Sequence, residues 1–259
     1  MNSDGDIAIS VKNLKLGYDD LVLLQNINFD VRRAEVFIIL GGSGSGKSTL
    51  LKHMIGLYQP IEGEVWIAGR NLVTAEGDER LAILRNFGVM YQSGALFGSL
   101  TVLENVQLPL EEFTELPQPA RELIALSKLK LVGLAEAAEK MPADLSGGMQ
   151  KRAAIARAMA LDPGILFMDE PSAGLDPITS AELDALIKNL SRTFGITFVI
   201  VTHELASIFA IADRVIMLDA RAKTIIAEGK PADLRDHAPD EWVRRFFNRE
   251  PEPAGAHGS

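Results

Sequence analysis

Gly41-Gly-Ser-Gly-Ser-Gly-Lys-Ser-Thr49 lies between the continuous apolar run 36–40 and the stretch 48–56, whose apolar residues recur at helical spacing. The run 36–40 predicts a buried parallel strand, and the spacing after it predicts a helix. Strand, glycine-rich turn and helix together hold phosphate, because glycines let backbone N–H groups turn inward and the helix adds its positive dipole end. The stretch 41–49 therefore predicts a nucleotide-phosphate site in an α/β fold.

The loop 41–49 offers polar groups for both the phosphates and a metal ion. Lys47 can reach the β- and γ-phosphates of ATP, and the Ser48 hydroxyl can ligate Mg²⁺. The other residues expected around the ATP are Gly41, Gly42, Ser43, Gly44, Ser45, Gly46 and Thr49. The alternative, a glycine-rich loop without a chemical role, is disfavoured by the strand before it and the helix after it.

A second apolar strand, Ile165-Leu-Phe-Met-Asp169-Glu170, ends in two acids. Beside a phosphate loop, Asp169 suits the carboxylate that stands behind the Mg²⁺ ligands, and Glu170 suits the general base that polarises the attacking water. Alone the pair is a moderate signal, because an Asp-Glu pair at a strand end is often only a solvated turn. Together with the loop 41–49 it predicts ATP hydrolysis.

The composition excludes several classes of function. The 259 residues are 47% hydrophobic, enough for one large domain or a core with one sub-domain, and the net charge of -9 argues against non-specific nucleic-acid binding. There is no cysteine, so disulfides and thiolate chemistry are excluded. The polar, acidic start lacks a signal-peptide pattern, and no run approaches the roughly 20 apolar residues that span a bilayer. We expect any action at a membrane to go through another subunit.

The order of apolar runs predicts an α/β core interrupted by a helical insertion rich in Leu, Ala and Glu. Strands are expected at 7–12, 22–30, 36–40, 87–91, 165–169, 197–202 and 215–219, with a hairpin over 60–69 that turns at Gly63. The expected units are the ATP-binding core, 7–92 and 161–235; the helical sub-domain, 93–160; a C-terminal partner-docking segment, 236–250; and a disordered tail, 251–259.

Leu145-Ser-Gly-Gly-Met-Gln150 opens a predicted helix upstream of the Asp-Glu strand. With the other two motifs, it resembles the nucleotide-binding domain of ABC transporters and its LSGGQ signature. The resemblance implies a P-loop (RecA-like) α/β core with an N-terminal antiparallel β sub-domain and an inserted α-helical sub-domain. It also implies a head-to-tail dimer, in which the residues acting on the ATP of the other subunit are Ser146, Gly147, Gly148 and Met149. Met149 stands where the family has Gln, a departure that leaves the backbone cradle intact.

The remaining elements of the family match single positions. By resemblance, Tyr18 stacks on adenine, Gln92 holds Mg²⁺ together with Ser48, and His203 contacts the γ-phosphate. The D-loop, which crosses the dimer interface in the family, corresponds to Ser172, Ala173, Gly174, Leu175 and Asp176. For Tyr18 the alternative is a surface tyrosine, and for His203 it is a structural histidine.

Three further stretches, 88–106, 171–178 and 242–247, resemble the ATPases of Mla-type phospholipid transport systems. This resemblance implies a subunit at the cytoplasmic face of the inner membrane of Gram-negative bacteria, held there by an integral-membrane permease (MlaE-like). It also implies a STAS-domain protein (MlaB-like) and an MCE-domain protein (MlaD-like) in the complex. The implied role is phospholipid transport between inner and outer membrane, which maintains the lipid asymmetry of the outer membrane.

Two apolar clusters outside the motifs suggest contacts with other subunits. Gly94, Ala95, Leu96 and Phe97 follow Gln92 directly and are predicted to lie beside a permease helix; the alternative is the core of the helical sub-domain. Trp242, Phe246 and Phe247 share one face of a predicted C-terminal helix and are predicted to dock on a partner. Here the alternative is packing onto their own domain.

Other classes of function fit the sequence less well. ATPases of this type in DNA repair or translation resemble long coiled-coil or tandem-domain chains, and this chain has one nucleotide-binding domain and no heptad insertion. A non-enzymatic nucleotide-binding regulator would lack Lys47, Glu170 or His203, and all three are present. An importer ATPase for an amino acid or a metal shares every catalytic motif, so only the three further stretches favour phospholipid.

Overall fold

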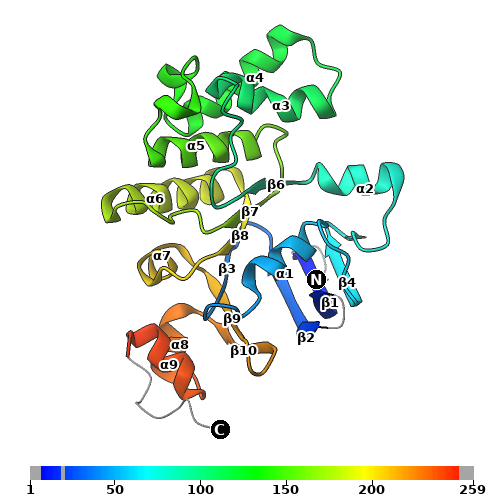
Figure 1. Ribbon diagram of the computed structural model, residues 1–259, viewed down its shortest axis with the longest axis vertical. Helices are drawn as coiled ribbons and strands as arrows, with labels where there is room; N and C mark the ends of the chain where they lie inside the picture. The colour runs from blue at the N-terminus through cyan, green and yellow to red at the C-terminus, as the bar shows by residue number, and fades with distance from the viewer. Residues whose placement is uncertain (1–6, 19–20, 251–259) are drawn as a thin grey trace.

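The computed structural model describes residues 7–18 and 21–250, the side chain of Tyr18 excepted. Its centre is a six-stranded sheet in the order β10-β9-β3-β8-β7-β6 (Figure 1). The strands are β3 (Val36–Gly41), β6 (Phe87–Met90), β7 (Ile165–Asp169), β8 (Thr197–Val201), β9 (Arg214–Asp219) and β10 (Thr224–Gly229). All neighbours pair in parallel except β10, which runs antiparallel to β9 at the edge. Strand β10 was not predicted from the sequence.

Apolar side chains on both faces explain why the central strands read as continuous apolar runs. In β3, Val36, Ile38 and Leu40 join one buried cluster, while Phe37 and Ile39 join the other. The first cluster is covered by α6 (Pro177–Phe194) and α7 (Leu205–Ile211), and the second by α1 (Lys47–Met54). The sheet is thus fixed from both sides, which holds the ends of its strands in place.

An antiparallel sheet in the order β2-β1-β4-β5 packs on the side of α1. It consists of β1 (Ile7–Tyr18), β2 (Leu21–Arg32), β4 (Glu62–Ile67) and β5 (Arg70–Asn71), so the first two strands are longer than predicted. The predicted turn at Gly63 is wrong. Gly63 lies inside β4 with φ 96°, where a Cβ would come within 2.4 Å of the Asn13 carbonyl oxygen. The chain turns instead at Ala68 and Gly69, both at positive φ, between β4 and β5.

A layer of helices stands at one end of the central sheet (Figure 1, green). It consists of α3 (Val102–Phe113), α4 (Gln118–Leu131) and α5 (Gly147–Ala158), with the short 3-10 helices η2 (Ala135–Ala137) and η3 (Pro142–Asp144) before α5. The helix α2 (Gly77–Leu84) precedes β6. At Gly88 in β6, a Cβ would lie 1.9 Å from the Ala158 carbonyl oxygen, so glycine permits the close approach of α5 to the sheet.

The C-terminal part described consists of two helices, α8 (Pro231–His237) and α9 (Glu241–Asn248). Phe247 of α9 is buried in the main core cluster, with its ring edge-on to Phe209 at 5.9 Å. The prediction that Phe247 docks on a partner is therefore wrong, because the residue packs on its own domain. Trp242 and Phe246 are half-buried against the same cluster. The predicted tail 251–259 lies outside the described residues.

Candidate nucleotide-binding and hydrolysis site

The predicted catalytic residues meet at one edge of the central sheet. The loop 41–49 follows β3, Asp169 and Glu170 close β7, and His203 follows β8. Because β3, β8 and β7 are adjacent and parallel, their carboxyl ends lie side by side, where open α/β sheets bind ligands. The topology therefore brings together residues that are far apart in the sequence.

The loop 41–49 has room for an anion at two of its glycines. A Cβ at Gly42 or Gly44 would meet no protein atom within 4 Å, whereas at Gly41 it would lie 2.5 Å from the Leu218 carbonyl oxygen. The positive φ of Gly44, 74°, favours glycine there, whereas Gly42 does not have a positive φ. The missing side chain of Gly42 thus leaves open the space into which a phosphate fits.

Lys47 lies inside the curve of the loop. Its Nζ donates hydrogen bonds to the carbonyl oxygens of Gly41 and Gly42, both at 2.9 Å. Burial lowers the pKa of Lys47, an effect that the carboxylates of Glu170 and Asp169 oppose. A cation held by two carbonyls, with two acids nearby, is placed to bind phosphate oxygens as a point charge.

A hydroxyl and a carboxylate lie together where a magnesium ion is predicted. Ser48 Oγ donates to Asp169 Oδ1 at 3.1 Å. Gln92 follows β6 at the same edge of the sheet, two residues beyond Met90, and its side chain is exposed. Residues 7–18 and 21–250 contain no cluster of three His, Asp or Glu that could hold a metal alone. A site with only a few protein oxygens is consistent with Mg²⁺, because this ion takes most of its ligands in nucleotide sites from phosphates and water.

Glu170 has an unusual backbone that the sequence could not reveal. Its φ is 47°, in the left-handed region, and its N–H donates to the Val201 carbonyl oxygen at 2.8 Å. Glu170 is 9% exposed; Oε1 lies 2.7 Å from His203 Nδ1, and Oε2 is buried without a hydrogen-bond partner. A buried, strained acid with one free oxygen is suited to act on a reacting group.

The signature residues open α5. Ser146 caps the helix, its Oγ accepting from the Met149 N–H at 3.3 Å. The Met149 side chain packs half-buried against the core, and Gln150 Nε2 donates to the carbonyl oxygens of Pro142 and Leu145. The glutamine beside the fifth signature position therefore turns back toward η3. What α5 presents is its N-terminal backbone and the exposed Ser146.

The D-loop residues connect Glu170 to α6. Asp176 caps α6 by accepting from the N–H groups of Ile178 and Thr179, and Gly174 has φ 79°. A Cβ at Gly148 would lie 2.4 Å from Thr179 Cγ2, so the signature helix and the start of α6 are in close contact. Ile178, with 75% of its surface exposed, lies at this junction. Ser172 is buried, and Ala173 and Leu175 are half-buried.

The segment after Gln92 is held in place by residues that were not predicted from the sequence. Arg157 donates to the carbonyl oxygens of Gly94 and Ala95, and the buried Asn105 donates to the Phe97 carbonyl oxygen and accepts from its N–H. Gly94 is buried and Leu96 is half-buried against the helical layer, as the alternative prediction had it. Ala95 is exposed, and Phe97 is 57% exposed. Tyr18 ends β1, but its side chain lies outside the described part of the chain.

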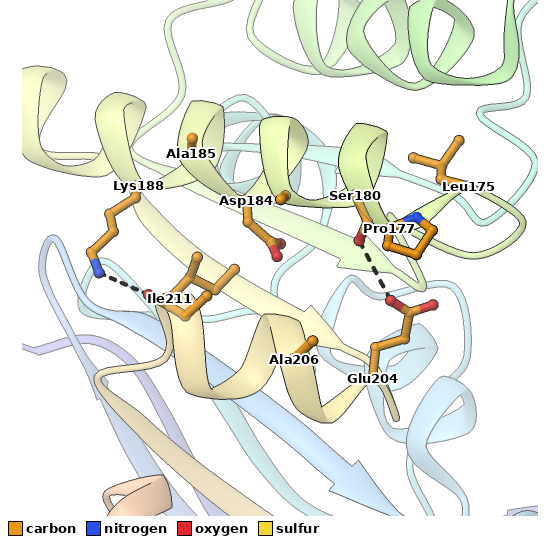
Figure 2. A pocket seen from close by; sticks show the side chains of 11 residues that line it. Leu175, Pro177, Ser180, Asp184, Ala185, Lys188, Glu204, Ala206 and Ile211 are labelled. Atoms are coloured by element: carbon orange, nitrogen blue, oxygen red, sulfur yellow. Dashed lines mark hydrogen bonds between the residues drawn. The ribbon is translucent and has the colours of Figure 1, made fainter.

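A groove of about 470 Å³ runs between α6 and α7, beside the D-loop (Figure 2). Two hydrogen bonds cross it, from Ser180 Oγ to Glu204 Oε2 at 3.5 Å and from Lys188 Nζ to the Ala210 carbonyl oxygen at 2.8 Å. Asp184 points into the groove between these bonds and is 7% exposed. Burial raises the pKa of Asp184, the Ser207 hydroxyl lowers it, and Glu204 adds to the rise.

We expect Asp184→Asn to stabilise the protein at neutral pH and not at acidic pH. The folded pKa of Asp184 lies above its ordinary value of 3.8, so the folded state holds the proton more tightly than the unfolded state. Asp184 then costs stability as the pH rises from its unfolded pKa through its folded pKa, and asparagine removes this cost. Urea unfolding across this pH range measures it. A variant without a gain at neutral pH, or with an equal gain at all pH values, would contradict the expectation.

A phosphate-binding loop, a strand-end acid pair and a histidine bonded to the second acid define a P-loop ATPase. The sequence model of the ABC transporter family matches residues 24–173. The chain belongs to this family, and it binds and hydrolyses ATP. The predictions of fold class, family and ATPase activity are thereby confirmed.

The comparisons with individual proteins narrow the relationship. The chain is 39% identical over 226 residues to the intermembrane phospholipid transport system ATP-binding protein MlaF of Haemophilus influenzae, covering 87% of this chain and 85% of that protein. It is 37% identical over 242 residues to the probable ribonucleotide transport ATP-binding protein mkl of Mycobacterium leprae, covering 93% and 69%. Among solved structures, it is similar to a dimeric ATP-binding cassette with ADP and Pi, with TM-score 0.77, 35% identity and coverage of 86% and 98%.

Proposed function

We propose that this chain is the ATPase subunit that energises phospholipid transport between the inner and outer membrane. The observation that carries the proposal is its similarity to proteins named as MlaF, at 37–39% identity over most of both chains. The mkl relatives, whose name gives ribonucleotide as the cargo, are similar to nearly the same degree. Cargo is recognised by the permease and not by this subunit, so the ATP chemistry below is the same for either.

In one subunit, ATP lies with its phosphates in the loop 41–49 and its adenine on Tyr18. Lys47 binds the β- and γ-phosphates, and Ser48 and Gln92 hold Mg²⁺ with Asp169 behind them. When bound, Mg²⁺ neutralises charge on the β- and γ-phosphate oxygens. The 3.1 Å contact of Ser48 with Asp169 and the open space at Gly42 support this arrangement.

Glu170 accepts a proton from the attacking water, and His203 contacts the γ-phosphate and orients Glu170. The 2.7 Å hydrogen bond between the two side chains, and the free Oε2 of Glu170, support these roles. With Oε1 engaged by His203, Oε2 is the oxygen left without a hydrogen-bond partner, and we assign the proton transfer to it. The left-handed backbone of Glu170 sets the direction of the side chain.

Two copies of the chain form a head-to-tail dimer around two ATP molecules. The N-terminus of α5 in one subunit, with Ser146, Gly147 and Gly148, faces the γ-phosphate held by the other, and the D-loop 172–176 crosses between them. The exposed Ser146 and Ile178 at the junction of α5 and α6 support this interface, and the similar solved structure is itself a dimer. ATP favours the closed dimer, and hydrolysis lets it open.

The dimer acts at the cytoplasmic face of the inner membrane through an integral-membrane permease. Among the residues described, no helix is long and apolar enough to cross a membrane. The contact with the permease includes Ala95 and Phe97, which Arg157 and Asn105 hold in a fixed position. A STAS-domain protein and an MCE-domain protein complete the complex, with Trp242 and Phe246 as candidates for contact with a partner.

We expect Phe97→Asp to lower transport on the order of tenfold or more, the effect of losing one interface hot spot. The ATPase activity of the isolated chain should stay within about twofold, because Phe97 points away from the core and a large share of it is exposed. Phospholipid transfer by the reconstituted complex, measured beside ATP hydrolysis by the subunit alone, separates the two. Leu123→Asp is the matched control, because Leu123 is 70% exposed on α4. Unchanged transport in Phe97→Asp would remove Phe97 from the interface.

Co-purification of the tagged chain from its native membrane in mild detergent tests the whole proposal. Mass spectrometry should find a permease, an MCE-domain protein and phospholipid. A permease that comes with a soluble solute-binding protein, or with bound nucleotide cargo, would overturn the phospholipid assignment and leave the ATPase assignment intact.

A further inference from the structure

Two cations of the signature helix α5 bind three carbonyl oxygens in the segment that follows β6. Lys151 Nζ donates to the Gln92 carbonyl oxygen, and Arg157 donates to those of Gly94 and Ala95 at 2.8 and 2.7 Å. Gln92 follows β6, which pairs with β7, the strand that ends at Asp169. The bond from Lys151 therefore joins α5 directly to the edge of the sheet that carries the site.

Lys151 is an unusual residue for a helix surface. It is 7% exposed, and its ammonium group is bound to a neutral carbonyl rather than to a carboxylate. Burial lowers the pKa of Lys151, an effect that the carboxylate of Glu170 opposes. A buried cation without a paired anion costs stability, so a smaller or apolar residue would stabilise the fold at least as well. This cost points to a role beyond packing.

The position of Lys151 suggests what that role is. Lys151 lies on α5 two residues after Met149, the last residue of the signature, and it binds the backbone of the one predicted Mg²⁺ ligand that comes from outside the loop 41–49. A shift of Gln92 toward or away from the metal would move its carbonyl and pull on Lys151. Because α5 is a continuous helix of 12 residues, that pull is transmitted to Ser146 at its N-terminus.

We propose that Lys151 is a positioning residue that couples Gln92 to the signature end of α5. It holds Gln92 where its side chain reaches Mg²⁺, and it moves α5 when Gln92 engages the metal. The inference rests on the metal role proposed for Gln92. It assigns to Lys151 a function in the ATPase cycle that neither the phosphate loop nor the signature residues supply.

The test compares Lys151→Met, Lys151→Gln and Lys151→Arg with the parent chain in ATPase assays at varied Mg²⁺. We expect Lys151→Met and Lys151→Gln to lower kcat, and to raise the Mg²⁺ concentration for half-maximal rate, each on the order of tenfold, as for partners that orient a metal ligand. KM for ATP should change little, since Lys47 and the loop are intact. Lys151→Arg keeps the charge and should keep both kcat and the half-maximal Mg²⁺ concentration near the parent values. The control Lys130→Met removes a charge from an exposed site on α4.

Urea unfolding of each variant separates positioning from folding. If Lys151 has only a structural role, its substitution should lower the urea midpoint of unfolding, and the protein that remains folded should show the parent Mg²⁺ dependence of the ATPase rate. That result would overturn the proposal. So would a Lys151→Arg chain that behaves like Lys151→Met. If Lys151→Met does not fold, Lys151→Gln, which keeps a polar group in the site, decides the same question.

The variant Gln92→Ala tests the role of Lys151 separately from the metal role proposed for Gln92. If Gln92→Ala shifts the Mg²⁺ dependence and Lys151→Met and Lys151→Gln do not, the coupling by Lys151 is wrong and the role of Gln92 stands. If Gln92→Ala leaves the Mg²⁺ dependence unchanged, the metal role of Gln92 and the inference fall together. A shift of similar size in all three variants supports the coupling.

Discussion

Glu170→Gln should lower ATP turnover by a factor on the order of 10²–10⁴, the range for loss of a general base. The amide has nearly the same shape as the carboxylate, and its oxygen can still accept from His203 Nδ1, which lies 2.7 Å from Oε1 in the parent chain. What the variant loses is the ability to take a proton at Oε2. ATP binding should be kept, so that kcat falls while KM for ATP stays close to the parent value.

The Glu170→Gln variant should also accumulate a dimer in the presence of ATP. In the proposed cycle, closure depends on ATP binding and opening depends on hydrolysis, so a chain that binds ATP without hydrolysing it should stay closed. Gel filtration with ATP and with ADP measures this, and Glu112→Gln, which changes an exposed acid on α3 outside the site, is the control. Turnover at the parent rate in Glu170→Gln would take the role of base away from Glu170. A large loss of ATP affinity would show a structural role instead.

The sequence predicted the core of this fold because the physical signals were local. A fully apolar run such as 36–40 is typical of a strand that is buried on both faces. Helix α1 begins within the motif 41–49, and α6 begins directly after Asp176, so both motifs mark the start of a helix. Gly63 shows the limit of such signals. A glycine at positive φ serves a turn or a close approach of two strands, and only the neighbouring Asn13 carbonyl tells which.

The C-terminal helix shows a second limit. The spacing of its aromatic residues correctly predicted one apolar face on α9. Periodicity does not say what covers a face, and Phe209 of the same chain covers Phe247. The docking prediction was therefore wrong for the most buried residue of the three.

For the site, the sequence predicted the residues that we propose carry the chemistry, and it did not predict the residues that hold the segment after β6 in place. Strand ends are local features, so the sequence could place Asp169 and His203 each at the end of a predicted strand. Lys151, Arg157 and Asn105 bind backbone carbonyls. Every residue has a backbone carbonyl, so the sequence does not indicate which one a side chain binds. The left-handed backbone of Glu170 is likewise invisible, since glutamate has no preference for it.

Ser146→Asp should lower ATP turnover by a factor on the order of 10² or more. It should not weaken the helix or the binding of ATP by a single subunit. Aspartate caps a helix as well as serine, so the bond to the Met149 N–H can be kept. The negative charge of aspartate, however, repels the γ-phosphate. The substitution also removes the hydroxyl donor of Ser146, and the loss of one donor to developing charge lowers the rate by a factor on the order of 10²–10³. Because the signature is proposed to act on the ATP of the other subunit, we expect the cost to fall on the closed dimer.

Ser146→Asn is the matched control, since asparagine also caps the helix and carries no charge. We expect Ser146→Asn to keep ATP-dependent dimerisation, measured by gel filtration in the Glu170→Gln background, and Ser146→Asp to lose it. Binding of a fluorescent ATP analogue to the dilute monomer should be the same in both, because Lys47 and the loop 41–49 lie in the other half of the site. If Ser146→Asp weakens binding to the monomer, Ser146 faces the ATP of its own chain, and the head-to-tail arrangement is refuted.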